Sequence, residues 1–99
     1  MDNIRIHNGI VEIVLSGKVY ADKAIDLRER LFPYLGAGYN RFWFDMTAMD
    51  YIDSSGIGFL LAIHKRADKL GGEVVITGLQ GDMYKLFELT QLTHLFKLT

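Results

Sequence analysis

The sequence contains no cysteine, a single proline and no long hydrophobic run. Without cysteine, disulfides and thiolate metal sites are excluded, which suits a reducing compartment. The longest apolar stretch, residues 57–63 with one glycine inside it, is far too short to span a bilayer. Residues 1–3 lead directly into a strand pattern, without the basic and apolar regions of a signal peptide. We therefore expect a cytoplasmic chain that does not enter a membrane.

An excess of charge of one sign is also lacking. Eleven lysines and arginines stand against twelve aspartates and glutamates, which gives a net charge of −1 at pH 7. No basic field is available to attract nucleic acid. The chain has 99 residues, and 49% of them are hydrophobic, which is ordinary for one globular domain. We therefore predict a single domain over residues 1–99 that does not bind nucleic acid.

The first half of the chain has the patterns of a hairpin followed by a helix. Residues 4–7 alternate between apolar and polar, and Asn8-Gly9 is a strong signal for a two-residue hairpin turn. A second strand is predicted over 10–15, ending at a Ser-Gly pair. Residues 20–35 have helical spacing, and Pro33 should kink or fray the last turn because it removes a helix hydrogen bond.

The second half continues the alternation of strands and helices. The predicted elements are a strand over 41–46, a loop over 47–50, a helix over 54–70, a strand over 74–76, a short helix over 82–89 and a final strand over 95–98. Phe42-Trp43-Phe44 should be buried on both faces of a central strand. This order predicts an α/β fold with a mixed, mostly parallel sheet of about five strands, in which the opening hairpin forms an antiparallel edge.

Catalytic and cofactor sites find little support in the sequence. The three histidines, His7, His64 and His94, lack metal-ligand spacing. Ser54 and His64 lie ten residues apart on one predicted helix, about 15 Å along its axis, so they cannot form a nucleophile–base pair. Gly17-Lys18 lacks the other residues of a phosphate-binding loop. We predict no catalytic residue, no metal and no cofactor.

The most informative segment is Asp53-Ser54-Ser55-Gly56-Ile57-Gly58, which opens the helix predicted from residue 54. A helix N-terminus carries about half a positive charge and tolerates a phosphate. No lysine or arginine lies between Arg41 and Lys65, whereas Asp45 and Asp50 do. The segment is therefore either a capped helix start beside ordinary turn aspartates, or an acidic rim where a phosphate of about −1.5 to −2 charges would repel an acidic partner.

Apolar side chains surround this segment. Met49, Tyr51, Ile57 and Phe59 cannot all point inward from one loop and one helical turn. We expect some of them to form a contact patch and the others to be local packing.

Over nearly its whole length the chain resembles the STAS domain of small bacterial anti-sigma factor antagonists. The resemblance rests on Leu15-Ser16-Gly17, on Asp45 at the end of the central strand, on residues 49–58, on Gly71-Gly72-Glu73 and on residues 86–90. It implies a STAS domain over residues 1–99, with helices packed mainly on one face of the sheet.

The resemblance also implies a partner switch. The serine after the motif aspartate, here Ser54, would be the phosphorylated residue. Unphosphorylated, such a domain binds an anti-sigma factor that is also a serine kinase, and a sigma factor is released. The kinase then phosphorylates the serine with its own ATP and Mg²⁺, the complex dissociates, and a PP2C-type phosphatase resets it. The implied partner surface comprises Tyr20, Asp22, Asp50, Asp53, Ser55, Gly56, Ile57 and Gly58. Tyr20 stands where resembling proteins carry an aspartate.

Two alternative functions stay open. The first is a scaffold STAS domain that associates with itself without phosphorylation. Tyr20 favours it, as does the end of the sequence at Thr99, where many resembling proteins add a helix. A part of the sheet would then be uncovered, and we expect a monomer or a weak homodimer. The second is a sensor that holds a nucleotide or anion at Ser54 to Gly58, which no basic residue near in sequence supports.

Overall fold

A five-stranded sheet organises residues 3–99, the part of the chain that the computed structural model describes. The order of strands in the sheet is β1-β2-β3-β4-β5; β1 and β2 are antiparallel, and each later neighbour is parallel. The elements are β1 (Asn3–His7), β2 (Ile10–Val19), α1 (Ala21–Gly36), β3 (Arg41–Ile52), α2 (Ser54–Lys69), β4 (Glu73–Thr77), α3 (Gly81–Leu89), the 3₁₀ turn η1 (Leu92–His94) and β5 (Lys97–Leu98). The predicted mixed, mostly parallel sheet is confirmed.

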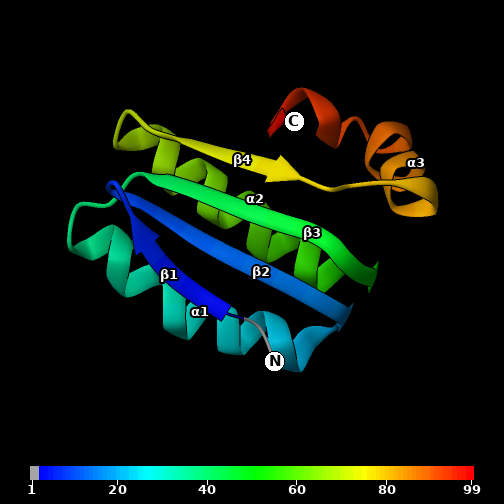
Figure 1. Cartoon of the computed structure of the whole chain (residues 1–99), viewed down its shortest axis with the longest axis horizontal. Helices are drawn as coiled ribbons and strands as arrows, with labels where there is room; N and C mark the ends of the chain where they lie inside the picture. Colours follow the sequence, from blue (N-terminus) through cyan, green and yellow to red (C-terminus); the bar gives the residue numbers. More distant parts are fainter. Residues whose placement is uncertain (1–2) are drawn as a thin grey trace.

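Helices α1 and α2 lie side by side on the same face of the sheet, as Figure 1 shows, whereas α3 lies beyond the end of β4. Alternate strand residues point toward these helices and form the core. The core side chains of the strands include Val11, Ile13, Leu15, Phe42, Phe44, Met46, Val74 and Ile76, and they pack against Leu27, Leu31, Phe59, Leu60 and Ile63 of the helices. None of the helices within residues 3–99 has the length and apolar run needed to cross a bilayer.

The other face of the sheet is uncovered over its centre. Trp43 and Val14 are each 39% exposed there. The prediction that Phe42-Trp43-Phe44 is buried on both faces is therefore wrong for Trp43, although β3 is central as predicted. The physical reason is that alternate residues of β3 face opposite sides, and only one side carries helices.

Strands β2 and β3 both continue past their predicted ends. The expected stop at Ser16-Gly17 and the expected loop over 47–50 are wrong, because β2 runs to Val19 and β3 to Ile52. The ladder between them continues through two register shifts, and Gly17 adopts a φ of +68° at one of them. Backbone pairing extends both strands beyond the ends that their side-chain patterns predict. As a result their last residues, Val19 and Ile52, are register partners.

Two turn predictions have different outcomes. The hairpin turn is confirmed, since Asn8 and Gly9 both have positive φ, 52° and 76°, between paired strands. The expected fraying at Pro33 is wrong, because α1 runs through it to Gly36. The backbone N–H of Ala37 donates to the carbonyl of Pro33 at 3.0 Å, so the last turn is closed after the proline.

Candidate functional site

The ends of β2 and β3 and the starts of α1 and α2 meet at one end of the domain (Figure 1). Parallel strands followed by helices place both strand-to-helix junctions at the same edge of the sheet. A backbone hydrogen bond joins the two junctions, because the N–H of Asp53 donates to the carbonyl of Val19 at 3.1 Å. Tyr20 and Ser54, 34 positions apart in the sequence, therefore belong to neighbouring junctions.

Asp53 is the cap that starts α2. Its backbone is extended, and its Oδ1 accepts a hydrogen bond from the Gly56 N–H at 3.1 Å, while its carbonyl accepts from the Ile57 N–H at 3.0 Å. Ser54 and Ser55 occupy the first helical turn and are exposed. The site thus presents two exposed serines at a capped helix start.

The two glycines of the segment have different surroundings. Gly56 is buried, and a Cβ at this position would lie 2.5 Å from Cγ1 of Ile52 and 3.0 Å from Cγ1 of Val19. Gly58 is exposed, and a Cβ there would meet nothing within 4 Å. Gly56 therefore allows α2 to pack directly against the ends of β2 and β3, beneath the surface that Ser54 and Ser55 present.

The apolar residues around the segment divide as the sequence suggested. Met49 and Phe59 are buried and belong to the core, Ile57 is half-buried, and Tyr51 is exposed. Tyr51 and Tyr20 form an aromatic pair, with ring centroids 5.9 Å apart and both rings more than 40% exposed. The sequence marked each tyrosine separately but could not predict this pair, because the pair requires β2 and β3 to extend to their observed ends.

Three acidic residues lie at the two junctions: Asp53 directly before Ser54, Asp50 near the end of β3 and Asp22 in the first turn of α1, and we call these three the acidic rim. Asp22 and Asp50 are exposed, Asp53 is half-buried, and within the described part of the chain none of the three forms an ion pair. One cation that sequence proximity missed is Lys18, an exposed residue of β2 whose register partner on β3 is Tyr51. A second lysine, Lys23, lies beside Asp22 in the first turn of α1, and its Nζ donates to the Ser16 carbonyl at 2.8 Å. Three carboxylates against these two lysines leave the junctions with a net negative charge, which disfavours a bound anion and favours a less acidic partner.

Replacing Asp53 by alanine should lower the free energy of unfolding by about 1 kcal/mol, because the Gly56 N–H loses its acceptor. Asp53→Asn keeps a cap oxygen and should cost only a few tenths of a kcal/mol. Urea unfolding monitored by circular dichroism measures both values. Asp50→Ala is the matched control, since Asp50 is exposed and caps no helix. Equal losses for Asp53→Ala and Asp50→Ala would contradict the capping role.

Two further arrangements would indicate other chemistry in the described residues, a metal cluster and a Ser54–His64 pair. Among the residues that the structure describes, no group of three His, Cys, Asp or Glu side chains is placed to hold a metal ion. The ring of His64 packs edge-on against Phe96, with centroids 5.5 Å apart, and so lies in a packing contact three turns along α2 from Ser54.

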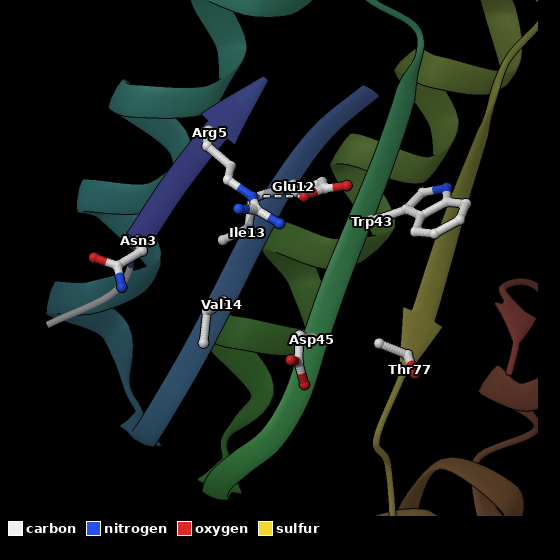
Figure 2. A pocket seen from close by; sticks show the side chains of 8 residues that line it. All are labelled: Asn3, Arg5, Glu12, Ile13, Val14, Trp43, Asp45 and Thr77. Carbon is white, nitrogen blue, oxygen red and sulfur yellow. Dashed lines mark hydrogen bonds and ion pairs between the residues drawn. The ribbon is translucent and has the colours of Figure 1, made fainter. Parts of the chain in front are cut away.

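A separate hollow of about 230 Å³ lies on the uncovered face of the sheet (Figure 2). Its lining residues are Asn3, Arg5, Glu12, Ile13, Val14, Trp43, Asp45 and Thr77. Arg5 Nε donates to Glu12 Oε1 at 2.7 Å, so these two charges compensate each other. The hydroxyl and N–H of Thr47 donate to Asp45 Oδ1 at 2.7 and 3.0 Å and hold the pKa of this carboxyl below its ordinary value of 3.8. The expectation that Asp45 belongs to the acidic rim with Asp50 and Asp53 is therefore wrong, because its side chain points to the uncovered face of β3 and lines this hollow.

Similarity to known proteins agrees with this architecture. The anti-sigma-B factor antagonist of Listeria monocytogenes is 27% identical over 88 residues, which are 89% of this chain and 77% of that protein. The anti-sigma-B factor antagonist of Bacillus subtilis is 23% identical over 97 residues, which are 98% of this chain and 88% of that protein. The solved structure of the Bacillus cell fate determinant SpoIIAA in its phosphorylated form shares the fold, with a TM-score of 0.83 at 17% identity over 100% of this chain and 91% of that one.

The family model described as the STAS domain matches residues 3–99. This match covers every strand and helix that the structure describes, and it confirms the resemblance that the sequence motifs suggested. The chain belongs to the STAS domain family.

Proposed function

We propose that this chain is an anti-sigma factor antagonist that Ser54 phosphorylation switches off. The observation that carries the proposal is the exposed Ser54 hydroxyl at the capped start of α2, inside an acidic rim and beside an exposed tyrosine pair. Two curated relatives named anti-sigma-B factor antagonists support the role, and SpoIIAA, which shares the fold, is known in a phosphorylated form. The chain acts as a cytoplasmic regulatory binding protein and catalyses no reaction itself.

The unphosphorylated surface around Ser54 binds the anti-sigma factor. Tyr20 and Tyr51 supply rigid aromatic area of the kind that anchors protein interfaces. Ser55, Ile57 and Gly58 extend this area along the first turns of α2, and Asp22, Asp50 and Asp53 provide its acidic edge. Gly56 contributes from below, because its lack of a side chain sets how closely α2 approaches the strand ends.

Phosphorylation ends this binding through charge. The anti-sigma factor, acting as a serine kinase with its own ATP and Mg²⁺, transfers the γ-phosphoryl group to the Ser54 oxygen, and ADP and the hydroxyl proton leave. The product adds about −1.5 to −2 charges to a rim that already holds three carboxylates. Within an interface such a group must lose its hydration without gaining a counter-charge, so the complex dissociates. A PP2C-type phosphatase hydrolyses the phosphoester and restores the binding surface.

Mass spectrometry of the chain after incubation with the cognate kinase, ATP and Mg²⁺ tests the switch. The expected result is one added phosphate, located at Ser54, on the wild type and on Ser55→Ala, and none on Ser54→Ala. Both variants remove one exposed hydroxyl from the same helical turn, so they are matched. Phosphate on Ser54→Ala, or none on the wild type under conditions where the kinase binds it, would contradict the proposal.

A scaffold STAS domain that associates with itself is the second candidate. The uncovered sheet face with its exposed Trp43 favours this candidate, because parallel sheets are usually covered on both faces. Sedimentation equilibrium tests this second candidate. A purely monomeric chain at high concentration would exclude the scaffold, whereas a weak homodimer is compatible with either candidate.

A further inference from the structure

One face of the sheet is uncovered, as the helices packed mainly on the other face imply. Strands β2, β3 and β4 are parallel, and helices cover only one side of them (Figure 1). Parallel sheets are normally buried on both faces, because helices pack on each side. Here Val14 and Trp43 stay exposed at the centre of the sheet, beside the hollow of about 230 Å³. A helix from another molecule is the element that would complete the usual layering.

The apolar part of this hollow is well formed. The Trp43 indole lies across β4, as Figure 2 shows, where its register partner Val75 is only 2% exposed. One side of the indole is therefore packed on the sheet, and the rest borders the hollow together with Val14. A fixed indole offers a large apolar area at little cost in side-chain entropy.

The charges that line the hollow favour a partner with a cationic side chain. Arg5 and Glu12 neutralise each other, so Asp45 gives the lining its net negative charge. Both hydrogen bonds from Thr47 go to Oδ1, and within residues 3–99 the second oxygen of Asp45 accepts no hydrogen bond. Elsewhere on this face Arg41 and Glu73 are register partners, and Lys97 lies on β5, beyond the hollow. A carboxylate beside an indole is a favourable environment for an ammonium or guanidinium group.

We propose that the hollow bounded by Val14, Trp43 and Asp45 is a docking site for an amphipathic helix of a partner protein. The helix places an apolar side chain against Val14 and Trp43, and a lysine or arginine of its next turn reaches Asp45. The surface lies on the opposite face of the sheet from α1 and α2, so this docking does not depend on the proposed switch at Ser54.

Trp43 provides a direct measurement, because it is the only tryptophan in the chain and borders the hollow. The probe is a helical peptide of leucine, lysine and alanine without aromatic residues, and the control peptide carries glutamate in place of lysine. We expect a saturable blue shift of Trp43 emission with the lysine peptide only. Asp45→Asn keeps an acceptor for Thr47 but loses the charge, and it should weaken binding about fivefold.

Three further variants make the test decisive. Val14→Lys should abolish binding, since it puts a cation into the hollow, whereas Asp82→Asn, an exposed acid on α3, should bind like the wild type. Ser54→Asp should also bind the peptide normally, because Ser54 does not line the hollow. Failure of the docking proposal would therefore leave the proposed switch at Ser54 untouched. Equal binding of the glutamate peptide, no effect of Asp45→Asn and Val14→Lys, or no emission change at all would overturn the proposal. A shift of emission with protein concentration alone would overturn it in favour of a second copy as the occupant.

Discussion

Ser54→Asp is expected to weaken binding to the cognate anti-sigma factor by about a hundredfold, whereas Ser54→Ala should bind as tightly as the unmodified chain. The aspartate places a fixed charge inside a rim that already holds Asp22, Asp50 and Asp53. A charge brought against an interface without a partner costs about 3 kcal/mol, which corresponds to the expected factor. Isothermal titration calorimetry measures both variants, with the anti-sigma factor first isolated on immobilised Ser54→Ala.

The control for this prediction is Asn8→Asp. It adds the same charge at the β1–β2 hairpin, at the other end of the sheet, and aspartate tolerates the positive φ of 52° found there. Binding by Asn8→Asp should equal that of the wild type. The interpretation of Ser54 would be wrong if Ser54→Asp bound within about twofold of the wild type, or if both aspartate variants lost binding equally.

Gly56→Ala should lower the free energy of unfolding by about 2 kcal/mol and weaken anti-sigma factor binding as well. A Cβ at this buried position would lie 2.5 and 2.9 Å from Cγ1 and Cδ1 of Ile52, and because Ile52 is itself packed in the core, we expect α2 and the end of β3 to shift apart. That shift moves Ser54 relative to Tyr20 and Tyr51, which lie on the other side of the junction. Chemical unfolding and calorimetric titration with the anti-sigma factor measure the two effects.

Gly58→Ala makes the same chemical change two residues later, with the opposite expected sign. A Cβ at Gly58 meets nothing within 4 Å, and the residue lies inside α2, so alanine should raise the free energy of unfolding by about 0.5 to 1 kcal/mol. Similar destabilisation by both variants would show that general helix effects, and not the close approach of Gly56 to Ile52, set the cost.

The predictions from sequence are confirmed where residues close together in the sequence determine the structure. The Asn8-Gly9 hairpin, the alternation of strands and helices, and the helix that starts at Ser54 all follow from residues close together in the sequence. Asp53 is the clearest case, because both its cap geometry and its hydrogen bond to Gly56 are short-range features.

Apart from the turn at Pro33, the wrong predictions depend on how distant segments pair or pack. Residues 47–50 are predicted as a loop, yet the chain from Ala48 to Ile52 forms a ladder with β2, and this ladder places Tyr20 against Tyr51. In the same way, the composition around Trp43 indicates a buried strand, but whether a second layer covers that face is decided elsewhere in the molecule. Nothing near these residues in the sequence carries that information.

The central claim is that a phosphate at Ser54 alone separates the bound and unbound states. Its most direct test is calorimetric titration of the anti-sigma factor with three preparations of this chain: unphosphorylated, fully phosphorylated at Ser54, and phosphorylated and then treated with a PP2C-type phosphatase. Our account predicts binding by the first and third preparations and no detectable binding by the second. Equal binding by all three would contradict it.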